Sequence, residues 1–339
     1  MKRWSAWLLV LALMTAAPAL AADGITEFGR RDAAARLVIW GATDLDELRP
    51  VLGRFLAQRP DLAITYVDIQ TAELYQRLRD RVIEQPDLAI SSAADLQIKL
   101  VNDGFAREHV PPADSALPPG ASWRGQAFGI SVEPAVIVYS RDFSRLGTPP
   151  RSRQELARML ESDQGALNDR IATYDIAQSG IGYLFASQDS LYSSTFATLA
   201  QGLGRARVRL YCCSADILRD IESGAVLVGY NVLGSYALAR RRQGAPIEIV
   251  LPEDYTLVLS RVAFIPRAAR RPDLGGQLLD FLLSAPAQVA LPKLADYGDM
   301  TRTTAHPIVL NPSLLVFLDS LRRSRFIRGW RALVAPAAN

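Results

Sequence analysis

The stretch that most constrains the fold is residues 125–143, GQAFGISVEPAVIVYSRDF, which reads as one extended segment leaving one lobe and entering another. Apolar and polar residues alternate up to Val132, and an unbroken apolar run follows at residues 135–138. This is the pattern of a strand that passes from half-buried to fully buried. Glu133-Pro134 lies between the two parts. Because proline cannot donate to a sheet ladder and favours an extended residue before it, we interpret the pair as a hinge.

A second crossing is predicted at residues 253–266, where residues 256–264 are again strand-like. Two crossings imply two lobes with a cleft between them. A chain of 339 residues that is 49% hydrophobic and 22% charged is long enough for two ordinary α/β domains. The predicted division has lobe 1 at residues 36–133 plus 253–305, lobe 2 at 134–252 and a helical tail at 306–339.

The first 21 residues read as a secretory signal peptide. Lys2 and Arg3 precede an apolar run, and Ala19-Leu20-Ala21 is a small-residue cleavage signature. That run is too short to span a bilayer, and no later stretch is long enough. We therefore predict a soluble, monomeric periplasmic protein cleaved near Ala21. Cleavage lowers the formal net charge from +3 to +1, because Lys2 and Arg3 leave with the peptide. A net charge this small does not indicate a nucleic-acid-binding protein.

The sequence offers no metal or cofactor site. His109 and His306 have no cysteine or histidine companions at metal-ligand spacing. The only cysteines, Cys212 and Cys213, are adjacent, whereas a disulfide that closes a loop needs cysteines that are separated along the chain. We expect two semi-buried thiols and no structural disulfide.

Strands and helices alternate along both predicted lobes. In the first, strands are expected at residues 37–40, 62–67 and 86–91, and helices begin after Asp44, near Ala72 and after Ser92. In the second, a capping box at Ser152 to Glu155 opens a helix, and the predicted strands lie at residues 170–174, 208–211, 226–230 and 247–251. Helices of this lobe are expected at 180–186, 214–222 and 231–240. A helix at 273–283 is expected to complete the first lobe, and an amphipathic helix is expected in the tail. This rhythm predicts two doubly wound α/β lobes with mainly parallel sheets.

In open α/β sheets the ligand lies outside the carboxyl ends of the strands, where helix N-termini converge. That rule selects the strand ends and the hinge as the ligand site. The candidate residues are Thr43, Asp44, Ser91, Ser92, Glu133, Tyr174, Ser179, Gly180, Gly182, Tyr230 and Asn231.

Two of these segments carry competing interpretations. Ser179 to Gly182 can form an anion cradle, since small residues allow close approach and free backbone N–H groups point outward, or an ordinary capped helix start. Tyr230-Asn231 can offer a phenol and an amide to a ligand, or be a buried tyrosine beside an asparagine cap. Ser91-Ser92 favours capping, and Glu133 favours hinge geometry. The sequence leaves these alternatives open.

Catalytic motifs are missing from the sequence. It has no Gly-x-Ser-x-Gly elbow, no phosphate-binding loop ending in Gly-Lys-Ser or Gly-Lys-Thr, no dinucleotide fingerprint after the first strand and no His-Glu-x-x-His. We therefore predict a binding protein and not an enzyme.

Residues 36–294 resemble the periplasmic solute-binding proteins of ABC importers, in particular the set that includes ferric-ion and organophosphate binders. The resemblance rests on PDLAISSAADLQIKLVNDGFA, the crossing GQAFGISVEPAVIVYSRDF, AQSGIGYLFA and ESGAVLVGYN, in that order. It implies two lobes that close on a ligand about a two-segment hinge, and a partner permease in the inner membrane.

The chain departs from the ferric members at one place. Those proteins use adjacent tyrosines shortly after the strand that corresponds to residues 226–230, and here Gly234-Ser235-Tyr236 occupies that position. The resemblance therefore favours a small organic anion, a phosphorylated or carboxylated metabolite, over ferric ion. A ligand sensor for a membrane histidine kinase and a periplasmic enzyme are the other functions considered. Neighbouring genes would distinguish transport from sensing.

Overall fold

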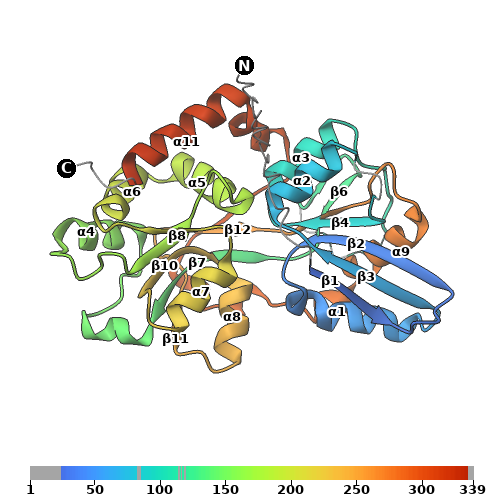
Figure 1. Ribbon diagram of the computed structural model, residues 1–339, viewed down its shortest axis with the longest axis horizontal. Coiled ribbons are helices and arrows are strands. Elements are labelled where there is room, and N and C mark those ends of the chain that lie inside the picture. Colours follow the sequence, from blue (N-terminus) through green and yellow to red (C-terminus); the bar gives the residue numbers. More distant parts are fainter. Residues whose placement is uncertain (1–23, 82–84, 114, 116, 118–119, 335–339) are drawn as a thin grey trace, which may run out of the picture.

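The protein has two α/β lobes, each built on its own sheet, as the computed structural model shows (Figure 1). The structure describes residues 24–81, 85–113, 115, 117 and 120–334. The predicted signal peptide lies outside these residues. None of the helices that the structure describes is long and apolar enough to cross a membrane. The predicted fold class, two doubly wound α/β lobes, is confirmed by this arrangement.

The sheet of lobe 1 has the strand order β1-β3-β2-β4-β13-β6-β5. The strand β2 pairs in parallel with β3 and with β4, whereas β1 and β13 run antiparallel to their neighbours. The strands are β1 (Gly24–Gly29), β2 (Ala35–Ala42), β3 (Leu62–Asp68), β4 (Leu88–Ser91), β5 (Ser122–Trp123), β6 (Ala127–Gly129) and β13 (Val262–Phe264).

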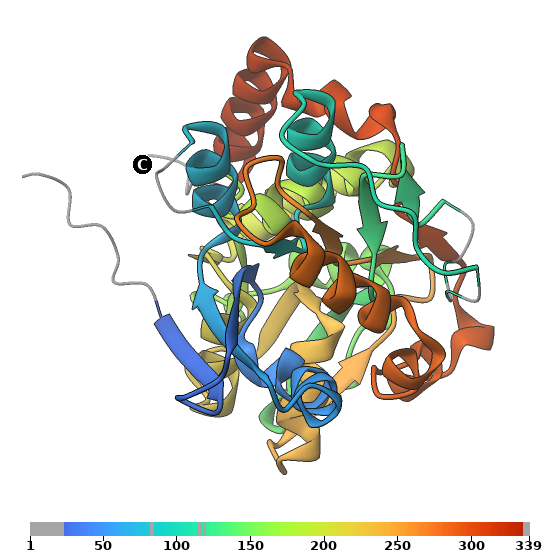
Figure 2. The same ribbon diagram turned by 90° about the vertical axis from the view of Figure 1, so that its right-hand side faces the viewer.

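Helices cover both faces of this sheet, as Figure 2 shows from the lobe 1 end. Alternate residues of β2 point to opposite faces, so Leu37 and Ile39 belong to one buried cluster and Trp40 to another. The first cluster is completed by α1 (Leu45–Gln58) and α9 (Pro272–Leu283), and the second by α2 (Thr71–Arg79) and α3 (Ala94–Asn102). The sheet is therefore wound on both sides, and its strand ends stay free.

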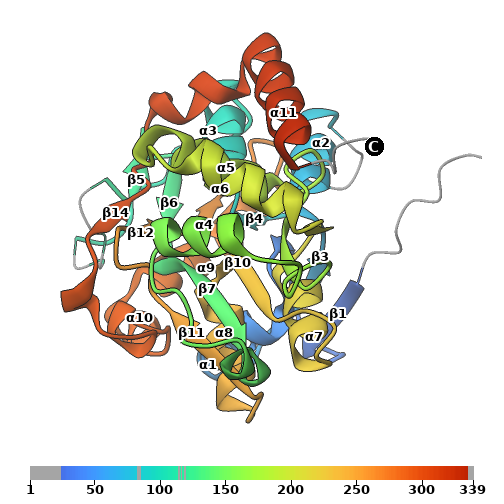
Figure 3. The same cartoon turned by 90° about the vertical axis from the view of Figure 1, so that its left-hand side faces the viewer.

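The sheet of lobe 2 has the order β14-β12-β7-β10-β8-β9, with β11 also paired to β7. Figure 3 shows its helices from the lobe 2 end. Val136 and Val138 share a cluster with α7 and α8, whereas Ile137 and Tyr139 share one with α4 and α6. The strands are β7 (Glu133–Ser140), β8 (Ile171–Tyr174), β9 (Arg209–Tyr211), β10 (Val228–Leu233), β11 (Ile247–Val250), β12 (Thr256–Leu259) and β14 (Ala305–Pro307). The helices are α4 (Arg153–Ser162), α5 (Gly180–Tyr192), α6 (Phe196–Arg205), α7 (Ser214–Glu222) and α8 (Gly234–Arg242).

Both crossings are shorter than the sequence suggested. Residues 130–132 connect β6 of lobe 1 to β7 of lobe 2, and residues 260–261 connect β12 of lobe 2 back to β13 of lobe 1. The two connections are bonded to each other, since Ile130 N donates to Arg261 O (2.8 Å) and Arg261 N donates to Ser131 Oγ (3.0 Å). The strand β12 therefore belongs to the second sheet, although the predicted segment 253–305 placed it in lobe 1. The strand β14 belongs to the same sheet and spans the predicted boundary between lobe 1 and the tail.

The C-terminal tail bridges the lobes. It consists of the 3-10 helix η4 (Pro312–Leu318), which packs on α3 of lobe 1, and the helix α11 (Ser320–Val334), which packs on α6 of lobe 2. Ile327, Trp330 and Val334 are buried on the inner face of α11, which runs along the top of lobe 2 in Figure 1. The tail is thus a brace across one side of the interlobe boundary.

Candidate ligand site between the lobes

A small cavity lies between the lobes where strands of both sheets end. Lobe 1 contributes the ends of β2 and β3 and the residue after β4, and lobe 2 contributes the end of β10 and the residues after β9. Its volume is about 40 Å³, which is room for only a few water molecules. The lining residues are Ala42, Thr43, Asp44, Asp68, Ile69, Gln70, Thr71, Ser92, Ile181, Cys212, Cys213, Ser214, Leu233 and Tyr236.

Six helices begin at this cavity. Residues of the first turn or of the N-cap line it from α1 and α2 in lobe 1 and from α5, α7 and α8 in lobe 2, and Ser92, one residue before the N-cap of α3, lines it as well. The N-terminus of a helix carries about half a positive charge, together with backbone N–H groups that have no partner inside the helix. Six such ends around one cavity create a site that favours an anion.

The side chains of the cavity carry negative and neutral polar groups. Among the described residues that line it, none is lysine or arginine. Burial and, to a smaller extent, the charge of Asp44 raise the pKa of Asp68 to about 7. Burial also raises the pKa of Asp44, although the phenol of Tyr236 and the charge of Arg261 oppose that effect. A carboxyl that is partly protonated near neutral pH is able to donate a hydrogen bond to an anion.

Thr43 supplies an unused hydroxyl. Its side chain is 2% exposed, and its Oγ1 is buried without a hydrogen-bond partner. An unpaired buried hydroxyl costs roughly 1–3 kcal/mol. The cleft thus contains a polar group that the fold leaves unsatisfied and that a ligand is placed to satisfy.

The two lobes touch around the cavity. Asp44 N donates to the phenol oxygen of Tyr236 (2.9 Å), and Gly180 N donates to Thr71 Oγ1 (3.0 Å). A Cβ atom at Gly180 would lie 2.7 Å from Thr71 Oγ1, so glycine is needed for this close approach. These contacts hold the two lobes together around the cavity.

Part of the predicted site lies at this cavity. Thr43, Asp44 and Ser92 line it directly. Ser91 is fully buried behind them, where its hydroxyl accepts a hydrogen bond from Ala93 N (3.2 Å). Gly180 borders the lobe contact described above. Three of the predicted residues, all from lobe 1, thus lie at the cavity.

Ser179 and Gly182 form the local structure of a capped helix. The Ser179 hydroxyl accepts from Gly182 N (3.1 Å), so it serves as the N-cap of α5. A Cβ atom at Gly182 would lie 2.2 Å from Tyr174 Cβ, so this glycine allows the helix to pack on β8. Of the two interpretations of Ser179 to Gly182, the anion cradle and the capped helix start, the structure shows the capping hydrogen bond. The helix α5 lines the cavity with Ile181.

Tyr174, Tyr230 and Asn231 do not line the cavity. Tyr174 is 1% exposed and hydrogen-bonds with Ser214 Oγ (2.6 Å). Tyr230 and Asn231 each donate to Asp189 Oδ2 at 2.6 Å, inside lobe 2. Tyr230 is thus a buried tyrosine whose hydroxyl is hydrogen-bonded within lobe 2, as one of the two interpretations expected.

These groups belong to a buried charge network in lobe 2. Arg153 Nε lies 3.1 Å from Asp189 Oδ1, and both side chains are 1% exposed. Tyr255 donates to the same Asp189 oxygen (2.7 Å), and its ring lies 3.9 Å from the Arg153 guanidinium carbon. Because each buried charge has an opposite charge and hydrogen-bond donors around it, the network fastens α4, α5 and β10 together.

Glu133 lies at the crossings, where the sequence placed it. Its carboxylate accepts from Ser131 Oγ (2.7 Å) and from Ser235 Oγ (2.6 Å). Arg261 Nε of the other crossing is 3.1 Å away, and both side chains are nearly inaccessible to solvent. The group joins the two crossings to the start of α8, which fits the interpretation of hinge geometry.

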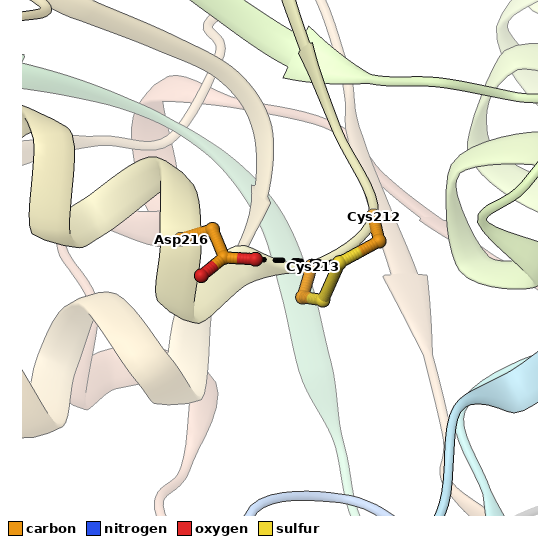
Figure 4. A group of neighbouring side chains, drawn as sticks. All are labelled: Cys212, Cys213 and Asp216. Atoms are coloured by element: carbon orange, nitrogen blue, oxygen red, sulfur yellow. Dashed lines mark hydrogen bonds between the residues drawn. A yellow bond between two sulfur atoms is a disulfide. The ribbon is translucent and has the colours of Figure 1, made fainter. Parts of the chain in front are cut away.

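The expectation about the cysteines was wrong. Cys212 and Cys213 are joined by a disulfide between adjacent residues. Both line the cavity, and Asp216 Oδ2 lies 3.3 Å from Cys212 Sγ (Figure 4). Loop closure, the usual reason for a disulfide, predicts no bond between adjacent cysteines, because adjacent residues close no loop. Because sulfurs joined in a disulfide are not thiolates, this trio is not a metal site in the oxidised protein.

Sequence reasoning did not name eleven of the fourteen residues that line the cavity. Nine of the eleven lie at or just after strand ends, where the same rule applies: Ala42, Asp68, Ile69, Gln70, Thr71, Cys212, Cys213, Ser214 and Leu233. The other two, Ile181 and Tyr236, lie in the first turns of α5 and α8. Tyr236 was considered only as a ferric ligand, and it lines the cavity as a single tyrosine.

Comparison with known proteins supports the family expected from the resemblance. Residues 37–294 match the family described as bacterial extracellular solute-binding protein. A search among curated proteins found no match. Among solved structures, the chain is 33% identical to the substrate-binding protein of an ABC transporter from Agrobacterium tumefaciens. That similarity covers 93% of this chain and 99% of that one, with a TM-score of 0.84.

Two more distant structures share the fold. The periplasmic binding protein AfuA from Actinobacillus pleuropneumoniae, solved with exogenous fructose-6-phosphate bound, is 18% identical over 89% of this chain and 99% of that one, with a TM-score of 0.74. Iron-bound HitA from Pseudomonas aeruginosa is 15% identical over 88% of this chain and 99% of that one, with a TM-score of 0.65. At such identities these likenesses show the architecture alone.

Proposed function

The chain belongs to the bacterial extracellular solute-binding proteins, and we propose that it captures a small organic anion between its lobes and delivers it to an ABC permease. Binding proteins of such importers hold a solute and pass it to a membrane partner, and they carry out no chemistry on it. Export to the periplasm, with cleavage of the signal peptide near Ala21, is part of the proposal.

The convergence of six helix N-termini on one cavity carries the proposal. Their backbone donors suit the oxygens of a phosphate or carboxylate group, and their dipoles favour its negative charge. Each lobe supplies three of the six ends, so a bound anion gains the second set only when the lobes come together.

The remaining cavity groups suit a ligand that also carries hydroxyls. The carboxyl groups of Asp44 and Asp68 accept hydrogen bonds from hydroxyls when ionised, and Thr43 offers a free hydroxyl. A phosphorylated sugar combines both kinds of group. Fructose 6-phosphate, which was bound to AfuA, is therefore the first probe.

A ferric ion is the weaker candidate. Ferric sites built on phenolates need more than one tyrosine, and Tyr236 is the single tyrosine among the described residues that line the cavity. Tyr230 is engaged by Asp189 and Arg153 inside lobe 2.

The test is a panel measured on mature protein that has been unfolded, refolded and freed of small molecules. Fructose 6-phosphate, inorganic phosphate, citrate, thiamin and ferric citrate are compared by thermal shift and then by calorimetry. We expect a raised melting temperature with an anionic organic probe, by mass action on the folded state. Stabilisation by thiamin alone, or a visible charge-transfer band with ferric citrate, would reject the organic anion.

A further inference from the structure

The disulfide between Cys212 and Cys213 forms part of the wall of the interlobe cavity. It follows β9 and precedes α7, and Cys213 is the N-cap residue of that helix. Its opposite neighbour across the boundary is Gln70, whose Oε1 lies 3.6 Å from Cys213 Sγ. The bond therefore lies at the start of α7 on the side that faces lobe 1. Figure 4 shows it directly before the helix that carries Asp216.

Stabilisation of the fold does not explain this bond. A disulfide stabilises a protein mainly by closing a loop in the unfolded chain, and the benefit grows with loop length. These two cysteines are neighbours, with a sequence separation of 1. The explanation has to be found in the folded state, at the cavity.

Cys213, one half of the bond, occupies the N-cap position of α7, where a side chain usually accepts a hydrogen bond. Serine, threonine, aspartate and asparagine are preferred at N-cap positions because their side chains accept from the free backbone N–H groups. Cys213 makes no such side-chain hydrogen bond. The backbone N–H groups at the start of α7 thus receive no hydrogen-bond acceptor from the N-cap side chain. Next to them, the two sulfur atoms present a polarisable, apolar surface.

We propose that the Cys212–Cys213 disulfide is a ligand-contacting wall of the cleft, and that its reduction lowers the affinity for the bound anion. This inference rests on the proposed function. The fixed bond holds both side chains in one conformation, so a ligand does not have to order them, and it keeps the α7 donors open toward the cavity.

Reduction changes the wall in two ways. A dithiol reductant breaks the S–S bond, and two S–H bonds form with the two electrons and two protons that the dithiol gives up as it becomes a disulfide. The two thiols then rotate independently and must be ordered again by a ligand. A thiol at a helix N-terminus also ionises more readily, so a thiolate at Cys213 would compete with the anion for the same helix end.

The experiment compares the oxidised and reduced full mature chain, with fructose 6-phosphate as the probe. Calorimetry is run in the absence of oxygen with and without dithiothreitol, and alkylation with mass spectrometry counts the free thiols. We expect the Kd to rise roughly tenfold on reduction and to recover on reoxidation. By linkage, saturating probe should shift the dithiol-disulfide equilibrium toward the oxidised form by the same factor.

The control is the C212S/C213S variant, which removes the bond but keeps two small polar side chains. It should bind the probe as weakly as the reduced protein and should not respond to dithiothreitol. If this variant does not fold, the comparison of oxidised and reduced wild-type protein decides alone. Equal affinity before and after reduction would overturn the inference and leave the proposed function in place. Failure of the oxidised protein to bind any anionic probe of the panel would remove the proposed function and the inference with it.

Discussion

The unpaired hydroxyl of Thr43 allows a sharp test of the ligand site. Replacing Thr43 with valine keeps the branched shape and removes only the hydroxyl. In the structure that hydroxyl is buried at the cavity and makes no hydrogen bond. The fold therefore loses nothing from the change, whereas a bound anion loses a donor.

The two effects have opposite signs. A buried hydroxyl without a partner costs roughly 1–3 kcal/mol, so Thr43→Val should stabilise the empty protein by about 1 kcal/mol. In a protein of this size that raises the melting temperature by about 2 °C. A hydrogen bond to a charged group contributes roughly 1.5–3 kcal/mol, so the affinity for fructose 6-phosphate should fall about ten- to a hundredfold.

The matched control is Ser179→Ala, which removes a hydroxyl that caps α5. Losing an N-cap costs about 1 kcal/mol, so this variant should melt at a lower temperature and bind the probe with unchanged affinity. Calorimetry and thermal unfolding are measured for both variants. If Thr43→Val lowers the melting temperature and leaves the Kd unchanged, the hydroxyl serves the fold and the reasoning fails. Weakened binding in Ser179→Ala would instead assign that hydroxyl to the ligand.

Three further predictions concern ionisable groups. The folded-state pKa of Asp68, raised to about 7, lies above its unfolded value, and a bound anion opposes ionisation further. The affinity for fructose 6-phosphate should therefore fall as the pH rises through 7, and Asp68→Asn should lose this component of the pH profile; an unchanged profile would contradict it. Burial raises the pKa of Asp95 from 3.8 to about 7, so Asp95→Asn should raise the melting temperature at pH 8. The same change should have little effect at about pH 3, where the carboxyl is mostly protonated in both states, and equal effects at both pH values would be the contrary result. Arg153→Met leaves Asp189 as an unpaired buried charge and should lower the free energy of unfolding by roughly 3–5 kcal/mol. The exposed pair of Arg207 and Asp169 is the control, because Arg207→Met should cost less than about 1 kcal/mol in a denaturant titration, and similar losses in both variants would refute the comparison.

Hydrophobic periodicity was sufficient for most of the fold. The buried strands β2, β3, β4 and β8 and the helices α7 and α9 lie within a few residues of their predicted positions, because each carries an unbroken apolar run or one apolar helix face. The strand β1 was missed because it is an exposed edge strand with little apolar pattern. The helix α6 was missed because its two glycines weaken the helical signal.

Two candidate residues of lobe 2, Tyr230 and Asn231, do not line the interlobe cavity, because β10 ends later than its apolar pattern predicts. The predicted strand stopped at Tyr230, whereas β10 continues to Leu233 and contains an irregular register between Gly229 and Val232. A strand that ends at Tyr230 puts Tyr230 and Asn231 at the predicted ligand site, but both side chains bond to Asp189 inside lobe 2. The observed strand end brings Leu233 and, shortly after it, Tyr236 to the cavity. Sequence patterns place strand ends only approximately, and a shift of an odd number of residues reverses the face of each side chain.

The division of the helix ends between the lobes has a consequence for release. An anion held by lysine or arginine keeps its charge partner when the lobes separate, but an anion held by helix N-termini loses three of the six on opening. Each end contributes roughly 0.3–1 kcal/mol at an exposed site, so an open lobe binds the anion only weakly. The closed cleft also excludes water, which strengthens each remaining contact. A permease that separates the lobes would therefore free the ligand without any change in the ionisation of a side chain. A lysine introduced at the exposed cavity residue Gln70 should retain the ligand in the open state and slow its transfer.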